Sequence, residues 1–343
     1  MNEPVIPTVA TPTMTTEYLG LSLCSPLVAS AGPLTGDPKM WARLEEAGAG
    51  AIVLPSLFEE EIEFDVFNVA ATYDRGTDVF AESLTYFPDL DAIAAGPDKH
   101  LELVEDAREV VDIPIIASIN GTSPGGWVRY ARALESAGAS AIELNVYDVA
   151  IDHRSTAADV ERRLVELVEE VRQEVSVPLA VKLGPWFTSF GHLAVALEQV
   201  GVDGLVLFNR FYQPDIDLDT LTMKPTLQLS SPGDIRLALH WIGALRGDLG
   251  CSLAATGGVH SGNDALKLLL AGADVVMTTS ALLRHGPDYL SIMRDEIAQW
   301  LLLHEYDGVH QLRGSMARHN VPDPDVYDRA NYYQILHSWP GKS

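Results

Sequence analysis

Eight short apolar segments recur along this chain, and each is followed by a segment with helical spacing. Each apolar segment is about as long as a buried strand and has few polar interruptions. We predict strands at residues 27–29, 51–54, 114–119, 141–144, 178–183, 204–208, 252–256 and 274–278. Because no linker or change in composition divides the 343 residues, the repeat favours one closed (β/α)8 barrel, an α/β TIM barrel, over a doubly wound sheet.

Two stretches of the chain do not follow the repeat. Pro55 is expected to end the second strand, and residues 57–96, which lack clean periodicity, are predicted to form an inserted lid. Residues 210–230 are predicted to be a second long connection. The predicted division of the chain is a flexible arm at 1–16, a (β/α)8 barrel at 17–304 that includes the inserted lid, and a polar C-terminal extension at 305–343.

Charge and cysteine content restrict the classes of partner. The formal net charge of −25 and the pI near 4.6 argue against a nucleic-acid partner and an anionic membrane surface. No apolar stretch reaches the roughly 18 residues of a membrane span, and no cationic segment precedes an apolar run as in a targeting signal. Cys24 and Cys251 are too few for a disulfide framework or a cysteine-ligated iron–sulfur cluster. We therefore expect a globular cytoplasmic protein.

The stretch AATGGVHSGNDALKLLLAGADVVMTTS near the C-terminal end of the repeat has the features of a phosphate-binding site. Its glycine pair follows a predicted strand, so backbone amides can approach an anion without obstruction. Ser261 with Asp264 resembles a capping box and predicts a helix start. The next strand ends in Thr279 and Ser280. Two such strand ends can supply several donors to one phosphate, although two ordinary βα turns would have the same pattern.

Polar or small residues follow seven of the predicted strands. In a barrel of this type, functional sites lie at the carboxyl ends of the strands. The residues at those ends are Ser30, Asn120, Asn145, Lys182, Asn209, Gly258 and Ser280. Since these ends meet at one mouth, we expect them to share one ligand site. The apolar residues before and after Lys182 indicate a lysine inside the barrel rather than one that reaches solvent.

From residue 21 to residue 281 the chain resembles the dihydroorotate dehydrogenase family of FMN-dependent barrels. The resemblance is carried by LCSPLVASAGPLT, ASIN, ELN, AVKLGPWF, LSSP, and the glycine pair with TTSA. It implies FMN as cofactor, with the phosphate held at the last two strand ends and with asparagine and lysine side chains bonded to the flavin ring or the substrate. The FMN-binding positions that it implies are Ala29, Ser30, Gly32, Asn120, Asn145, Lys182, Asn209, Ser231, Gly257, Gly258, Thr279 and Ser280.

Two residues are predicted to be catalytic. A lysine ammonium at the pyrimidine edge of the flavin stabilises the negative charge that develops as hydride arrives, and Lys182 is expected in this role. Where the family has a Cys or Ser base after the ELN motif, this chain reads NVYDVAID, which places Asp148 at that position. A carboxylate needs burial to become basic enough for this step, and a surface loop position is the alternative. The neighbouring Tyr147 is a candidate proton donor.

Other departures from the family concern the substrate. A family lysine after the second strand is replaced near Pro55 and Ser56, and an expected asparagine is Ala150. The asparagine-rich segment that contacts orotate has no counterpart in AESLTYFPDL. These changes remove groups that would hold orotate and leave the cofactor half intact. The pattern therefore supports flavin binding more strongly than oxidation of dihydroorotate.

The leading hypothesis is an FMN-dependent oxidoreductase of pyrimidine metabolism that acts on CH–CH bonds. Hydride would pass between flavin N5 and a small, dihydropyrimidine-like substrate. One alternative is a barrel lyase or aldolase that binds a phosphorylated substrate and forms an imine at Lys182. Another is an accessory subunit that binds FMN without turnover. A soluble electron-transfer partner and a homodimer are implied by the resemblance alone. The histidines lack metal-ligand spacing, so no metal is expected.

Overall fold

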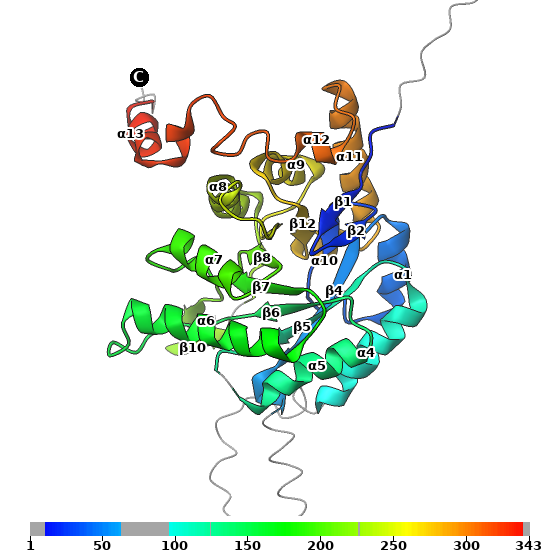
Figure 1. Cartoon of the computed structure of the whole chain (residues 1–343), viewed down its shortest axis with the longest axis vertical. Helices are drawn as coiled ribbons and strands as arrows, with labels where there is room; N and C mark the ends of the chain where they lie inside the picture. Colours follow the sequence, from blue (N-terminus) through cyan, green and yellow to red (C-terminus); the bar gives the residue numbers. More distant parts are fainter. Residues whose placement is uncertain (1–10, 63–95, 124, 226, 339–343) are drawn as a thin grey trace, which may run out of the picture.

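A closed barrel of eight parallel strands forms the centre of the computed structural model, which describes residues 11–62, 96–123, 125–225 and 227–338 (Figure 1). The barrel strands are β3 (Leu27–Ala29), β4 (Ala51–Phe58), β5 (Ile115–Asn120), β6 (Ala141–Asn145), β7 (Leu179–Leu183), β8 (Gly204–Leu207), β11 (Ser252–Thr256) and β12 (Val275–Thr278). Each strand pairs with the next in this order, and β12 pairs back to β3. The predicted (β/α)8 barrel is therefore confirmed.

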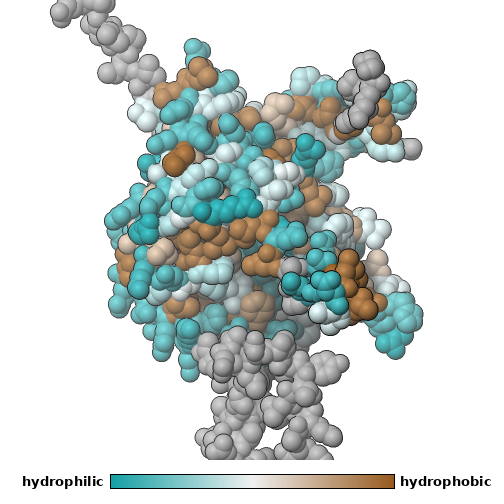
Figure 2. Space-filling model, turned by 180° about the vertical axis from the view of Figure 1, so that it is seen from behind, coloured by the Kyte–Doolittle hydropathy of each residue, from teal (hydrophilic) through white to brown (hydrophobic). Residues whose placement is uncertain are grey.

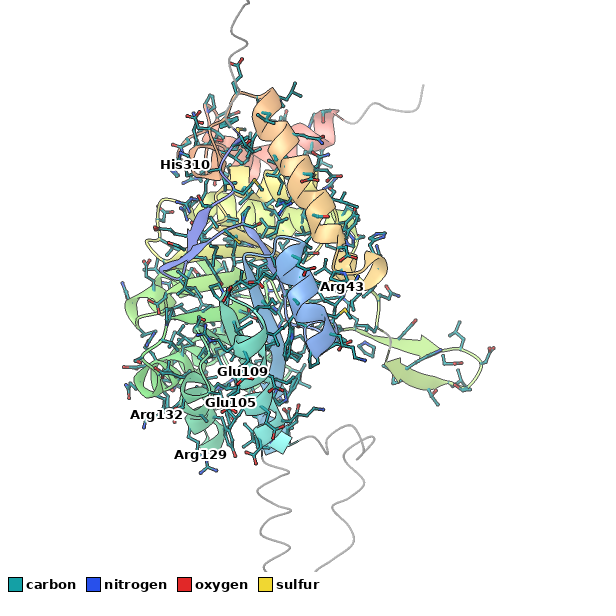
Figure 3. The ribbon with its side chains drawn as sticks, turned by 90° about the vertical axis from the view of Figure 1, so that its right-hand side faces the viewer. Arg43, Glu105, Glu109, Arg129, Arg132 and His310 are labelled. Carbon is teal, nitrogen blue, oxygen red and sulfur yellow. The ribbon has the colours of Figure 1, made fainter. Side chains whose placement is uncertain are left out.

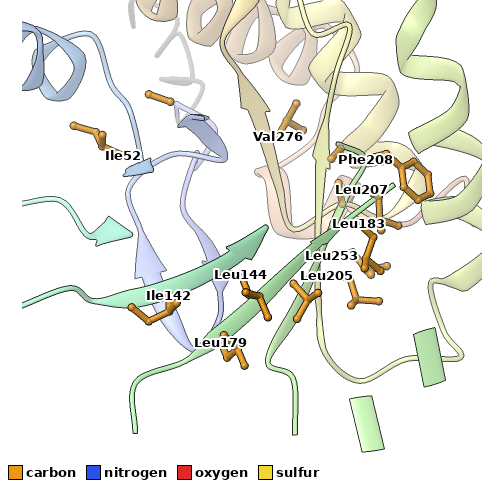
Figure 4. Packing of buried hydrophobic residues seen from close by; sticks show 14 of the residues in the cluster. Ile52, Ile142, Leu144, Leu179, Leu183, Leu205, Leu207, Phe208, Leu253 and Val276 are labelled. Carbon is orange, nitrogen blue, oxygen red and sulfur yellow. The ribbon is translucent and has the colours of Figure 1, made fainter. Parts of the chain in front are cut away.

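Helices surround the barrel and are joined to it by an apolar layer. They are α1 (Pro38–Glu46), α4 (Gly96–Val110), α5 (Arg129–Ser136), α6 (Ala157–Glu174), α7 (Phe190–Gln199), α8 (Ile235–Leu245), α9 (Gly262–Ala271), α10 (Ser280–His285) and α11 (Tyr289–Leu303). Alternation along each strand directs every second side chain outward. Figure 4 shows part of this layer, to which β6 contributes Ile142 and Leu144. The interior of the barrel instead holds small residues such as Ala141, Ala180 and Ala254.

An N-terminal hairpin closes the amino end of the barrel, and the sequence analysis missed it. It consists of β1 (Thr16–Tyr18) and β2 (Leu21–Leu23), joined through Leu19 and Gly20 at φ 54° and 72°. The Leu19 side chain is buried, and its amide donates to Ser252 Oγ at 3.0 Å. A Cβ on Gly204 would lie 2.5 Å from Leu19 Cδ2, so the glycine makes room for this contact.

The predicted end of the second strand at Pro55 is wrong. Strand β4 continues through Pro55 to Phe58, and its register with β5 shifts between Val53 and Ser56. Proline removes one backbone donor, and an irregularity of this kind absorbs the loss without ending the strand. Of the predicted lid at 57–96, residues 63–95 lie outside the described residues, and so the lid stays a prediction.

The predicted connection at 210–230 contains an unpredicted hairpin of β9 (Pro214–Asp217) and β10 (Thr222–Pro225). The hairpin extends away from the barrel in Figure 3. On the face of the molecule shown in Figure 2, hydrophobic surface lies beside hydrophilic surface. Asp217 Oδ1 accepts the amides of Asp219 and Thr220 at 3.0 Å each, which orders the turn and lowers the pKa of Asp217. The exposed apolar side chains of the hairpin are Ile216, Leu218, Leu221 and Met223.

Short elements complete the described chain. They are η1 (Gly126–Val128), η2 (Pro232–Asp234), α12 (Val309–Leu312), η3 (Pro324–Tyr327) and α13 (Arg329–Ser338). Thr13, within the predicted arm, forms a bridge with Gly308 in the predicted extension. Helix α13 extends from the body of the molecule in Figure 1. Within the described residues, no helix combines the length and apolar content needed to cross a membrane.

Candidate functional site

A cavity of about 720 Å³ opens at the carboxyl ends of the barrel strands. Its wall is formed by the segments that follow β3, β7, β8, β11 and β12, which lie far apart in the sequence and meet because the barrel is closed. The predicted site residues that line it are Ser30, Gly32, Lys182, Asn209, Gly257, Gly258, Thr279 and Ser280. The structure thus brings these positions to one site, and their role in binding FMN stays a prediction.

The glycine pair after β11 lies in the cavity wall in a conformation that favours glycine. Gly257 and Gly258 have φ values of 91° and 79°. A Cβ on Gly258 would lie 2.6 Å from the Ile235 amide nitrogen and 2.8 Å from the Ser231 carbonyl oxygen. A Cβ on Gly257 would have no atom nearer than 4.0 Å, so this residue faces open space. The pair lets the start of α8 approach from one side and leaves the other side free for a ligand.

The ends of β3 and β12 form the neighbouring part of the wall. A Cβ on Gly32 would lie 2.7 Å from Thr279 Cγ2, so only glycine permits this approach without a shift. Thr279 Oγ1 donates to the Ser30 carbonyl oxygen at 3.3 Å, and Ser280 Oγ accepts the Ser230 amide at 3.1 Å. Two hydroxyl groups that follow β12 are therefore held in the same cavity wall as the glycine pair.

A histidine and an arginine that the sequence analysis did not select lie behind this wall. His260 Nε2 lies 3.1 Å from Ser230 Oγ, and Arg284 donates to the Ser230 carbonyl oxygen at 3.2 Å. Burial and then the Arg284 charge lower the pKa of His260, which favours the neutral ring. Ser261 caps α9 by accepting the Asp264 amide at 3.2 Å, as the sequence predicted. The position of His260 directly after the glycine pair was the available sequence signal.

Lys182 lies inside the barrel, as predicted from the apolar residues around it. The residue is 7% exposed and lines the floor of the cavity from β7. Its Nζ lies 3.4 Å from Oε1 of Glu143, which is 1% exposed and comes from β6. A buried cation at this position can act on a ligand in the cavity with little screening by water.

The remaining predicted cofactor residues do not line the cavity. Asn145 accepts a hydrogen bond from the Asn209 side chain, so it holds a wall residue in place. Asn120 is buried at the end of β5. The Ala29 side chain belongs to the apolar layer outside the barrel, and the exposed Ser231 caps η2.

A smaller cavity of about 250 Å³ adjoins the first and contains the predicted base. Asp148 lines this cavity, and Asn209 and Trp186 are among the residues that line both cavities. Asp148 is exposed, so the described residues do not provide the burial that a basic carboxylate needs. Tyr147 lines the same cavity, and its hydroxyl oxygen accepts the Tyr212 amide at 3.0 Å.

Aromatic side chains from three strand ends gather beside the two cavities. The Tyr147 ring lies 6.5 Å from the Phe211 ring, and the Trp186 ring lies 6.1 Å from Phe211 in an edge-on arrangement. Trp186 and Phe211 line both cavities. Flat rings in this place suit contact with a planar ligand. The aromatic pair in GPWF, directly after the strand that carries Lys182, was the available sequence signal for this group.

Metal binding finds no support in the described part of the chain. Among those residues, no group of three or more His, Cys, Asp or Glu side chains is arranged to hold a metal ion. The polar groups that line the larger cavity include hydroxyls and amides, three cationic side chains (Lys182, Arg210 and Arg236), the imidazole of His240 and the single carboxylate of Asp234. This set suits an organic anion better than a bound cation.

Comparisons with known proteins agree with this geometry. The family model for dihydroorotate dehydrogenase matches residues 13–301. Dihydroorotate dehydrogenase A (fumarate) of Lacticaseibacillus paracasei is 33% identical over 189 residues, which are 53% of this chain and 64% of that protein, slightly under two thirds of its length. The catalytic subunit of dihydroorotate dehydrogenase B (NAD(+)) of Methanothermobacter thermautotrophicus is 25% identical over 318 residues, 87% of this chain and 97% of that subunit. The corresponding subunit of Geobacillus kaustophilus is 30% identical over 277 residues, 77% and 83% of the two chains.

Proposed function

The chain belongs to the dihydroorotate dehydrogenase family of FMN-binding oxidoreductases, and from this premise we propose that it transfers hydride between flavin N5 and a small dihydropyrimidine-like substrate. The observation that carries the proposal is the single cavity in which the glycine pair and the buried Lys182 meet. FMN has a phosphate at one end and, at the other, a ring that gains negative charge on reduction. The cavity contains groups suited to both ends.

The glycine pair provides the test of fit for the phosphate. The open side of Gly257 lies in the cavity wall together with the hydroxyl-bearing residues Thr279 and Ser280. A tetrahedral anion with several oxygens is the ligand that such a set of small and hydroxyl residues accommodates. The residues present therefore fit FMN, with these positions holding its phosphate and Lys182 facing its ring.

The side chains of the cavity supply position and charge. When bound, FMN provides the two-electron chemistry. The ammonium of Lys182 stabilises negative charge that develops next to it in the cavity, and the paired amides of Asn145 and Asn209 orient polar groups at the rim. Asp148 is proposed to take the proton from the substrate carbon next to the one that loses hydride.

The visible spectrum of the purified protein tests the cofactor assignment. We expect a yellow protein with bound FMN, which anaerobic addition of a suitable dihydropyrimidine bleaches. The screen would compare dihydroorotate, dihydrouracil and unsaturated acids as partners of the flavin. A protein that contains no flavin and does not take up added FMN would contradict the proposal at its first step.

Two single substitutions test the assignment of the base. Asp148→Asn should slow anaerobic flavin reduction about 100-fold, the usual contribution of a general base, and Tyr147→Phe should slow it less than threefold. Stopped-flow absorbance measures both rates, and the FMN content of each variant serves as its control. The reverse order of effects would assign the proton transfer to Tyr147.

The exposure of Asp148 favours one second candidate, a subunit that binds FMN but has lost turnover. In that case FMN binds and no compound in the screen bleaches it. The lyase alternative has less support because Lys182 is in an ion pair with Glu143, whereas imine formation requires a neutral amine. Borohydride trapping of a Lys182 adduct with a carbonyl substrate would restore that alternative.

Family membership also leads us to propose an assembly and a cellular location for the protein. We propose a cytoplasmic homodimer with a separate electron-transfer partner, and a division into arm, barrel and extension at residues 16/17 and 304/305. Two of the relatives are catalytic subunits of dihydroorotate dehydrogenase B (NAD(+)), which supports a partner of this kind. Light scattering of the purified chain measures the first part of this proposal, since a homodimer has twice the 37.2 kDa mass of the chain.

A further inference from the structure

Glu143 is an acidic residue placed inside the barrel, directly below the proposed cofactor site. Alternation along β6 directs Ala141, Glu143 and Asn145 to the interior, and Glu143 is 1% exposed. Carboxylates are seldom buried to this degree without a partner, because the loss of water destabilises the charge. The ELN motif contains this residue, but the proposed function uses only its asparagine.

The surroundings of Glu143 leave it dependent on one cation. Among the described residues, its ion pair is with Lys182, Oε1 to Nζ at 3.4 Å, and Oε2 is buried with no hydrogen-bond partner. The residues that pair with Glu143 on the adjacent strands do not bond to its carboxylate. The Ser118 hydroxyl on β5 is hydrogen-bonded to Ser56 at 2.7 Å, and the Ala180 side chain on β7 has no polar group. The Glu143 carboxylate therefore interacts with Lys182 on the side of the lysine that faces the barrel interior.

Tyr18 lies in the same interior and does not neutralise the carboxylate. Its phenol is 1% exposed, and its hydroxyl has no hydrogen-bond partner within the part of the chain that the structure describes. Burial first, and then the negative charge of Glu143, raise the pKa of Tyr18. Because both side chains are buried, little solvent lies between them to screen the charge of Glu143.

Stability alone does not explain this pair. Replacement of a buried ion pair by apolar residues of similar volume is often neutral or stabilising, and the same interior is otherwise filled by residues such as Val53 and Val206. Removal of one partner, in contrast, leaves an unpaired buried charge and has a large effect. We therefore expect the Glu143–Lys182 ion pair to affect mainly a ligand in the cavity, because Lys182 lines that cavity.

We propose that Glu143 is a positioning residue that holds the Lys182 ammonium in the cavity floor and sets the net charge that the floor presents to the flavin. The inference rests on the proposed function, since it requires FMN in this cavity. Glu143 does not touch the cofactor in this proposal and acts through Lys182. Its negative charge partly offsets the positive charge of the ammonium, so it disfavours reduction relative to an unopposed lysine.

The reduction potential of FMN bound to the 343-residue chain tests the proposal. Glu143→Gln keeps the shape and removes the charge, and so it should favour the reduced over the oxidised flavin by at least tenfold, a shift of about 30 mV to more positive potential for a two-electron couple. Lys182→Met should shift the potential in the opposite direction. Glu166→Gln, which removes an exposed acid paired with Arg162, is the matched control and should shift the equilibrium less than twofold.

A double-variant cycle separates positioning from a direct or structural effect. In the Lys182→Met background an unpaired buried carboxylate takes up a proton, so Glu143→Gln should then change the flavin equilibrium less than threefold. Equal shifts in both backgrounds, or an unchanged potential with FMN bound, would overturn the inference. A wild-type protein that does not bind FMN would instead overturn the proposed function. If Glu143→Gln does not fold, Glu143→Asp replaces it in the test, because aspartate keeps the charge. The flavin equilibrium of Glu143→Asp should shift in the same direction as predicted for Glu143→Gln, but less than threefold.

Discussion

Gly258 shows how one residue without a side chain can shape a binding site. Its φ of 79° is in the region that favours glycine, and backbone atoms of Ser231, Asp234 and Ile235 surround the place where a Cβ would lie. These atoms belong to the backbone of η2 with its N-cap and to the first residue of α8, and they cannot turn aside as a flexible side chain can. The close approach of two backbone segments therefore depends on this glycine.

Gly258→Ala should weaken FMN binding at least tenfold, because the new methyl group would push the α8 start away from the cavity wall. Gly286→Ala is the matched control, since Gly286 has a similar φ of 84° but no atom within 4 Å of an added Cβ. The control should lose about 1–2 kcal/mol of unfolding free energy from backbone strain alone and keep its FMN affinity. Fluorescence titration with FMN and urea unfolding measure the two quantities. Equal FMN affinities in both variants would show that the clash does not reach the site.

At the scale of elements, the β1–β2 hairpin covers the amino end of the barrel, which the eight βα repeats do not cover. A barrel of parallel strands has two ends, and its amino end needs apolar cover if its interior is to exclude water. Tyr18, Leu19 and Leu23 supply that cover and join the interior cluster of the barrel. The hairpin is thus part of the core, whereas the β9–β10 hairpin carries side chains that are largely exposed.

Leu19→Ala should lower the unfolding free energy by about 2–5 kcal/mol, the usual range for a buried leucine. FMN affinity should not change, because the hairpin lies at the end of the barrel opposite to the cavity. Leu218→Ala in the β9–β10 connection is the control and should have an effect within about 0.5 kcal/mol, since Leu218 is 81% exposed. Urea unfolding compares the variants. A loss of stability that is no larger for Leu19 than for Leu218 would mean that the hairpin does not close the core.

For the molecule as a whole, the free energy of unfolding depends on pH through histidines that are harder to protonate in the folded state than in the unfolded state. Burial lowers the pKa of His240, and burial with the Arg284 charge lowers the pKa of His260, both from 6.5. The unfolded chain therefore binds more protons than the folded chain below pH 6.5, so that stability falls as pH falls through this window. Glu135, whose pKa is lowered from 4.5 by its bonds to Ser176, affects stability only at lower pH.

The unfolding free energy should accordingly decrease as pH is lowered from 7.5 to 5.5, and the double substitution His240→Gln with His260→Gln should reduce this slope. Urea unfolding at several pH values within that range provides the measurement. His337→Gln, which changes an exposed histidine of α13, is the control and should leave the slope as it is. A slope that is the same in the double variant and the wild type would place the proton linkage at other groups.

Local sequence patterns anticipated most of the barrel and part of the site. The strand-length apolar segments and their helices have a period that only a few architectures satisfy, and the Ser261 cap and the burial of Lys182 follow from neighbouring residues. The continuation of β4 through Pro55 was missed because a register shift depends on the partner strand. The β1–β2 and β9–β10 hairpins were missed because their short strands mix polar with apolar residues and do not alternate with helices, so they do not match the repeat.

The sequence by itself thus determined the barrel and the set of small, amide and hydroxyl residues at its strand ends, since both depend on local periodicity. Only the tertiary structure decided which of these residues share a cavity. It joined Gly257 to Lys182 across the barrel mouth, placed Asp148 in an adjoining exposed cavity, and left Glu143 with Lys182 as its partner. Contacts between residues distant in sequence depend on barrel closure and strand register, which no single segment encodes.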